Sequence, residues 1–403
     1  MTKISLCNTY AKNLNTYTNK KMQTSFKSKK DDFKPTIVEG TQTYAKVYAA
    51  TLDDATKKQI KNICSHPVFK DLPVRIMPDT HAGKDVVVGF TAPIGTSGEI
   101  IPGLVSGDIG CGMLCCEIQP STDEIDFKKL DNVIRTYVSS HHDRIPTTKK
   151  NHLGQIEHEL EDICSKKIGV SKDKMIGSLG TLGTGNHFIE IDRSDDGKTY
   201  LVIHTGSRGF GQAVFKHHRN IALSQNPYYI ENLSYLTGDE AKEYLQDMQL
   251  AQKFSQVNRR IIADEIIKQM GWKEVDSFES IHNYIDKDGI IRKGAISAFE
   301  GQKAIIPLNM RDGALIVKGK GNPDWNNSAP HGAGRILSRM DASKKIDIEE
   351  YQKSMKGIYS SCVSKDTLDE APQAYKNSDE IKKFISDTVK IKKVIRPKFN
   401  FKD

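Results

Sequence analysis

Hydrophobic and polar residues alternate along the chain with two different periods. The three-to-four-residue spacing of amphipathic helices occurs in four segments. Thr51 and Asp54 form a capping box at the start of the first segment, and Gly271 supplies a stop signal for the last and longest one. We therefore predict helices over residues 51–65, 126–140, 152–167 and 239–271.

Short runs rich in β-branched and aromatic residues lie between these helices and predict strands. They cover residues 86–94, 113–119, 188–192, 200–204 and 315–317. Strands outnumber regular strand–helix–strand alternations, and no internal repeat or linker rich in Pro, Gly and Ser divides the chain. The pattern predicts one α+β domain over residues 46–403.

The first 45 residues have a different composition. Residues 1–30 are rich in Lys, Asn, Ser and Thr and contain no acid. A transit peptide would fit this composition, but arginine is absent, so we favour a basic, flexible N-terminal arm. The whole chain has 59 Lys and Arg against 51 acids, a net charge of +8 that permits RNA binding without demanding it.

Composition also limits the cellular setting. No apolar run approaches the ~20 residues of a membrane-spanning helix, and the N-terminal stretch has no apolar block long enough for a secretory signal. The seven cysteines are an odd, scattered set without a CxxC pair, which argues against a disulfide framework and a structural zinc module. We expect reduced thiols and a cytoplasmic location.

Glycine lets the backbone approach a ligand closely. Four glycine-rich segments, at residues 103–112, 177–185, 206–209 and 332–334, each adjoin residues that could carry chemistry. Oxygen, sulfur and nitrogen donors lie beside these segments and in Ile-His-Asn at 281–283. Such mixed donors suit zinc, manganese or iron, and five of them could bind two ions. A buried cysteine with a capping aspartate, and structural histidines at strand ends, are the alternatives. The candidate metal ligands are Asp108, Cys111, His187, His204 and His282.

The last glycine-rich segment places His331 after a proline, at a turn that we expect to open into a helix. Helix N-termini attract phosphate, so a neutral His331 imidazole could attack a phosphate, with Arg335 stabilising the developing charge. Arg208 follows His204 in a similar setting that suits a phosphate oxyanion. From these residues alone, His331 fits a nucleophile and a metal ligand equally well. A purely structural histidine is only slightly less favoured.

Taken together, five motifs resemble the RtcB family of RNA ligases, in the order found in that family. They are Met-Pro-Asp-Thr-His-Ala-Gly-Lys at 77–84, Gly-Asp-Ile-Gly-Cys-Gly at 107–112, Gly-Thr-Leu-Gly-Thr-Gly-Asn-His-Phe-Ile-Glu at 180–190, His-Thr-Gly-Ser-Arg-Gly at 204–209 and His-Gly-Ala-Gly-Arg at 331–335. The resemblance runs from about residue 70 to the end. It implies a catalytic domain with mixed β-sheets around a central cleft for metal and nucleotide.

The resemblance also implies an activity. RNA ends with a 3′-phosphate or 2′,3′-cyclic phosphate would be joined to 5′-hydroxyl ends, in RNA repair or tRNA splicing, with GTP consumed and manganese, expected as two ions, bound by the five donors. His331 would carry the guanylate, and Arg208 and Arg335 would neutralise phosphate charge. The implied nucleotide contacts are Asn186, Glu190, Asn283, Pro307, Met310, Gly332, Ala333, Gly334, Tyr375 and Lys402. We expect a monomer that can work with accessory proteins and has no membrane partner.

The sequence departs from the family pattern at one loop. Residues 307–310 read Pro-Leu-Asn-Met where many relatives carry Pro-Gly-Ser-Met, and Ala314 occupies a family serine position. Polar contacts to the base should therefore differ. Alternative functions are a guanylyltransferase that caps RNA 3′-phosphates, a metal-bound RNA-binding protein with weakened catalysis, and a metallophosphoesterase.

Overall fold

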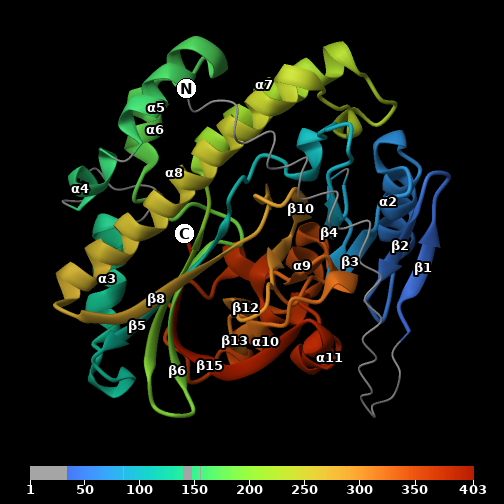
Figure 1. The fold of residues 1–403 in the computed structure, drawn as a ribbon. Helices are drawn as coiled ribbons and strands as arrows, with labels where there is room; N and C mark the ends of the chain where they lie inside the picture. Colours follow the sequence, from blue (N-terminus) through green and yellow to red (C-terminus); the bar gives the residue numbers. More distant parts are fainter. Residues whose placement is uncertain (1–33, 85, 139–147, 155) are drawn as a thin grey trace.

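A seven-stranded antiparallel sheet forms one layer of the computed structural model, which describes residues 34–84, 86–138, 148–154 and 156–403 (Figure 1). The strand order is β12-β13-β15-β6-β7-β5-β8. The strands are β5 (Gly112–Gln119), β6 (Phe188–Ser194), β7 (Thr199–Thr205), β8 (Lys273–Ile281), β12 (Lys303–Asn309), β13 (Gly313–Gly319) and β15 (Val389–Phe401).

This sheet curls until its two edge strands meet, since the Ile305 amide of β12 donates to Ser280 Oγ of β8 over 2.9 Å. Its inner face packs apolar side chains such as Met113, Val202 and Ile395 into one core. Its outer face packs against helices α3 (Phe127–Tyr137) and α8 (Gly238–Met270). The side chains of the central strands β5 and β7 therefore alternate between two buried environments, whereas much of the edge strand β8 is exposed.

A six-stranded sheet forms the second layer, in the order β1-β2-β3-β4-β10-β9. Strands β2 and β3 are parallel and are connected through α2 (Asp54–Cys64), while the other neighbours are antiparallel. The strands are β1 (Thr36–Glu39), β2 (Tyr44–Val47), β3 (Val74–His81), β4 (Val88–Pro93), β9 (Tyr284–Ile285) and β10 (Ile290–Lys293). The boundary expected at residue 46 falls inside β2, so this sheet includes residues that the sequence assigned to the arm; residues 1–33 lie outside the described chain.

A short pair, β11 (Ala295–Ser297) and β14 (Ser328–Pro330), lies beside both sheets and ends directly before His331. In Figure 1 the long helix α8 runs diagonally across the molecule, and α7 (Arg208–Gln225) packs against its N-terminal half. The remaining helices of four or more residues are α4 (Lys149–Leu153), α5 (Glu157–Ile163), a π-helical turn (Cys164–Ile168), α6 (Lys172–Ser178), α9 (Arg339–Lys345), α10 (Ile348–Ser354), a 3-10 helix (Lys365–Glu370) and α11 (Ser378–Phe384).

The predicted α+β class and the longest helix are confirmed, with Gly271 capping α8 in the left-handed conformation. Three local predictions are wrong. Asp53, not Thr51, caps α2, because its carboxylate accepts the Thr56 amide. The helix expected over 152–167 is broken into α4, α5 and a π-helical turn. No helix starts at His331: residues 331–338 form bends and a bridge before α9 begins. Within the described ranges, no helix is both long and apolar enough to cross a membrane.

Candidate functional site

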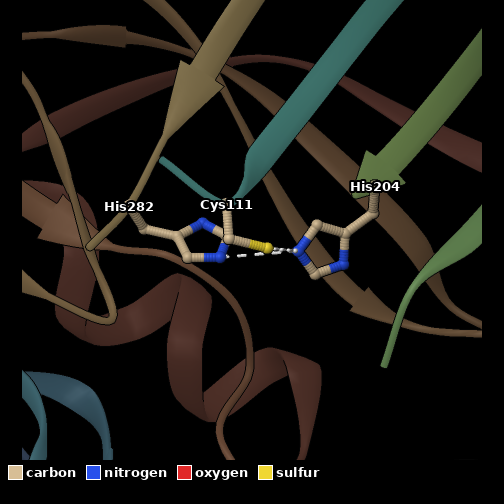
Figure 2. A group of neighbouring side chains, drawn as sticks. All are labelled: Cys111, His204 and His282. Carbon is tan, nitrogen blue, oxygen red and sulfur yellow. Dashed lines mark hydrogen bonds between the residues drawn. The ribbon is translucent and has the colours of Figure 1, made fainter. Parts of the chain in front are cut away.

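The predicted metal ligands come together because they lie at the ends of neighbouring strands. Gly112 of β5 pairs with Thr205 of β7 on one side and with Ile281 of β8 on the other. Residues one position away, Cys111, His204 and His282, are therefore forced into proximity. Figure 2 shows these three side chains converging from β5, β7 and β8.

Neighbouring donor atoms of the cluster lie close enough together to share a metal ion. Cys111 Sγ is 3.3 Å from His204 Nε2 and 3.5 Å from His187 Nε2. His204 Nε2 lies 3.4 Å from His282 Nε2, and His187 Nε2 lies 3.9 Å from an Asp108 carboxylate oxygen. The cluster divides into two overlapping groups, Cys111 with His204 and His282, and Cys111 with Asp108 and His187.

The surroundings of the cluster fit a metal ion. His187 Nδ1 lies 3.0 Å from the Leu182 carbonyl and His204 Nδ1 lies 3.2 Å from the Asn186 carbonyl, so the Nδ1 atoms carry the protons and Nε2 is free to bind. Burial lowers the pKa of His204 and of His282 well below the usual range, which keeps both imidazoles neutral.

The acidic donors add to this fit. Burial, helped by Asp108, raises the pKa of the Cys111 thiol, so a cation is needed to hold the thiolate. Burial alone would raise the pKa of Asp108, but His187 holds it well below the usual range. Mixed O, N and S donors sharing one thiolate suit a site for two divalent ions.

His331 faces the same space from the other side. Its ring centroid is 4.8 Å from that of His282. Asp79 Oδ2 lies 2.6 Å from His331 Nδ1 and also accepts the backbone amides of His331 (3.0 Å) and Gly332 (3.2 Å). Because a carboxylate only accepts, Nδ1 carries the proton and the lone pair of Nε2 is free. Asp79 itself is fully buried in β3.

A cavity of about 320 Å³ joins His331 to the metal-ligand cluster. All the residues that the resemblance assigned to nucleotide contacts line this cavity, and so do His331, Arg335, Asp108, His204 and His282. Cys111 and His187 lie behind the lining, in contact with His204 and Asp108. Arg208 is not part of the lining.

The predicted arginines occupy different settings. Arg208, at positive φ, lies against the glycine loop: a Cβ on Gly183 would be 1.6 Å from its guanidinium, and its Nε donates to Thr181. The guanidinium of Arg335 donates to Glu370 and to the Asp369 and Leu337 carbonyls, and it lies over the Tyr375 ring. The N–H groups of Arg335 are thus bound to residues of the cavity wall.

One wall of the cavity is organised by Glu370, which the sequence did not single out. Its carboxylate contacts Tyr375 Oη (2.7 Å), Lys402 Nζ (3.1 Å), Arg335 (3.2 Å) and Arg339 (2.9 Å). Lys402 also donates to the His187 carbonyl at 3.3 Å, which links the C-terminus to the metal-ligand cluster.

Other contributors were also missed by the sequence reading. Lys293 is partly buried in the cavity wall and donates to the Val105 carbonyl and to Ser106, and desolvation lowers its pKa to about 8. Asp79 lies in the motif at 77–84, whose function the sequence alone does not indicate. The signal for Asp79 was an acid inside an apolar strand, because such an acid needs a specific partner.

Comparison with known proteins gives the same assignment. Residues 59–403 match the family model described as "RtcB: tRNA-splicing ligase RtcB". The chain is 30% identical to the RNA-splicing ligase RtcB of Escherichia coli (strain K12) over 378 residues, covering 83% of this chain and 91% of that protein. It is 27% identical to the tRNA-splicing ligase RtcB of Aeropyrum pernix over 399 residues, covering 76% and 82%. Because the family match spans most of its length, the chain belongs to the RtcB family.

Proposed function

We propose that this protein is an RNA ligase that joins 3′-phosphate or 2′,3′-cyclic phosphate ends to 5′-hydroxyl ends, using GTP and manganese. The observation that carries the proposal is the free Nε2 of His331, which Asp79 aims into a cavity that also holds the convergent metal donors. Family membership and the names of the relatives, RNA-splicing and tRNA-splicing ligases, support the substrate class.

In the first step, His331 Nε2 attacks the α-phosphorus of GTP. A nitrogen–phosphorus bond forms as the bond to the pyrophosphate leaving group breaks. The imidazole ring gains positive charge in this step, and the Asp79 carboxylate on Nδ1 stabilises that charge. The hydrogen bond to Asp79 therefore holds the ring in one orientation before the nucleotide binds.

In the later steps, an oxygen of the RNA 3′-phosphate takes the guanylate from His331, and the 5′-hydroxyl then attacks that phosphate and releases GMP. A 2′,3′-cyclic end must first be hydrolysed, because it has no terminal phosphate oxygen to accept the guanylate. Bound manganese, held by Asp108, Cys111, His187, His204 and His282, would act as a Lewis acid that polarises phosphate oxygens.

The chain's own cations complete the charge balance. We assign phosphate neutralisation to Arg208 and to Lys293. Their side chains interact electrostatically with Asp108 and Cys111 of the metal-ligand cluster. We assign to Arg335 the support of Glu370 and Tyr375 at the nucleotide wall. The six cysteines of the described chain are all free thiols, which agrees with the cytoplasmic location that we propose.

The test is covalent labelling with α-³²P-GTP and manganese, followed by a denaturing gel. Wild type and the control His158→Ala, an exposed histidine outside the cavity, should retain label, whereas His331→Ala and Cys111→Ala should not. Labelled protein is then given RNA with a 3′-phosphate and RNA with a 5′-hydroxyl. Joined RNA supports a ligase, guanylate-capped RNA without joining supports the capping enzyme, and no label on wild type with any nucleotide refutes the proposal.

A further inference from the structure

Two acids on β6 face the interior of the curled sheet. Glu190 and Asp192 are two positions apart on one strand, so their side chains share a face, while Ile189 and Ile191 point to the opposite core. Glu190 is 3% exposed and lines the cavity, whereas Asp192 is fully buried behind it. The charge of Glu190 acts on Asp192, and two buried carboxylates that interact in this way favour a state in which the pair shares one proton.

The two acids differ in their hydrogen-bond partners. Asn400 of β15 is the register partner of Glu190, and its side-chain amide donates to Glu190 Oε1 over 2.6 Å. Lys402 adds a nearby positive charge. Neither oxygen of Asp192 has a hydrogen-bond partner within the described residues. A donated hydrogen bond favours a charged carboxylate, and the lack of one favours the neutral acid.

The pKa shifts of the two acids agree with a charged Glu190 and a protonated Asp192. Burial raises the pKa of both acids, but Asn400 and Lys402 oppose the rise at Glu190, where the value reaches about 7. At Asp192 nothing opposes it, and the charge of Glu190 raises the pKa further. The proton therefore belongs to Asp192.

We propose that Asn400 is a positioning residue that keeps Glu190 charged and aimed into the cavity, with Asp192 holding the proton, and so sets the preference for guanine over adenine. This inference rests on the proposed function, because it assumes that a nucleoside triphosphate fills the cavity. Asn400 itself is fully buried and does not line the cavity. Its effect on the nucleotide passes through Glu190.

The chemistry of the two bases makes the charge of Glu190 decisive. Guanine presents two donors side by side, N1–H and the N2 amino group, and a charged carboxylate accepts both. Adenine presents an acceptor at N1 beside its N6 amino group, which suits a protonated carboxyl group that donates once and accepts once. A site built for one hydrogen-bond pattern rejects the other strongly, because a mismatch leaves buried groups without partners.

The experiment compares covalent labelling by GTP and by ATP in wild type, Asn400→Leu and Asp192→Asn, with manganese present. Asn400→Leu removes the donor at similar size, and the ratio of kcat/KM for GTP over ATP should fall roughly 10- to 100-fold, mostly through KM for GTP. Asp192→Asn removes the competing acid at the same shape, so Glu190 stays charged and the ratio should hold or rise. Asn400→Val, which suits a strand, replaces the leucine variant if that variant does not fold.

The possible results distinguish a failure of the Asn400 inference from a failure of the proposed ligase function. An unchanged GTP-to-ATP ratio in a folded Asn400 variant overturns the inference while leaving the ligase proposal standing. An equal loss of ratio in Asp192→Asn also overturns it, because that result means only that the interior of the curled sheet was damaged. Absence of label on wild type removes the proposed function, and the inference with it.

Discussion

Replacing Asp79 by asparagine is the sharpest perturbation of the proposed nucleophile. The variant keeps the shape of the side chain, and its amide oxygen can still accept the backbone amides of His331 and Gly332 now bound to Oδ2. It removes the negative charge that lies 2.6 Å from His331 Nδ1. The contact to the imidazole keeps its direction and loses its charge, and the new amino group takes the place of Oδ1, which has no hydrogen-bond partner among the described residues.

The expected magnitude follows from that one contact. A hydrogen bond to a charged acceptor exceeds a neutral one by about 1–2 kcal/mol, and the difference grows as the ring becomes cationic during attack on the phosphate. We expect a loss of about 2–4 kcal/mol of transition-state stabilisation, or roughly a 30- to 1000-fold slower guanylylation.

The assay is single-turnover labelling at saturating GTP, because the charge acts on the chemical step and not on nucleotide binding. KM for GTP and the metal content should stay near the wild-type values. Asp123→Asn is the control for the same chemical change, since Asp123 is an exposed partner of Arg193 and does not line the cavity. If Asp79→Asn labels within roughly threefold of wild type, Asp79 does not prepare His331 for attack.

Three further predictions concern the metal, the scaffold and pH. Cys111→Ser should lower bound manganese, measured by elemental analysis of purified protein, while Cys164→Ser should leave it unchanged; equal loss in both would contradict the assigned ligand. Arg259 is fully buried and donates to Glu279 and to the Gly110 and Thr205 carbonyls. Arg259→Leu should therefore lower the free energy of unfolding, measured in urea, by about 3–5 kcal/mol. A change below about 1 kcal/mol would show that this network contributes little to stability. Burial raises the pKa of Glu190 to about 7, and the contact to guanine needs the charged carboxylate. KM for GTP should therefore rise as the pH falls through neutrality. A KM that stays flat from about pH 6 to 8 would count against this base contact.

Local sequence patterns were sufficient for elements whose stability is local or whose pattern is regular. Helix α8 has a long apolar periodicity and a glycine stop, and its bounds were predicted closely. The predicted strands include β5 and β7, which are buried and rich in apolar residues. Strand β8 was not predicted, because much of it is exposed and polar, and its pairing with β5 is what makes it a strand.

The identity of the chemical groups in the site was also available from sequence. Glycine loops beside Asp108, Cys111, His187 and His204 marked them as donors, because the backbone of such loops is shaped for close approach to a ligand. The resemblance to the RtcB family added roles to these positions. Neither source could say which side chains touch.

Tertiary structure decided the contacts that set the chemistry. Asp79 and His331 are 252 positions apart, and Glu190 and Asn400 are 210 positions apart, yet each pair shares a short hydrogen bond. Such pairs depend on strand register and on the curl of the sheet, which many distant side chains fix together. The sequence by itself therefore determined the class of fold and the kinds of reactive groups. Only the packed chain determined which nitrogen of His331 is free and which buried acid carries charge, because hydrogen bonding and burial set the protonation of each group.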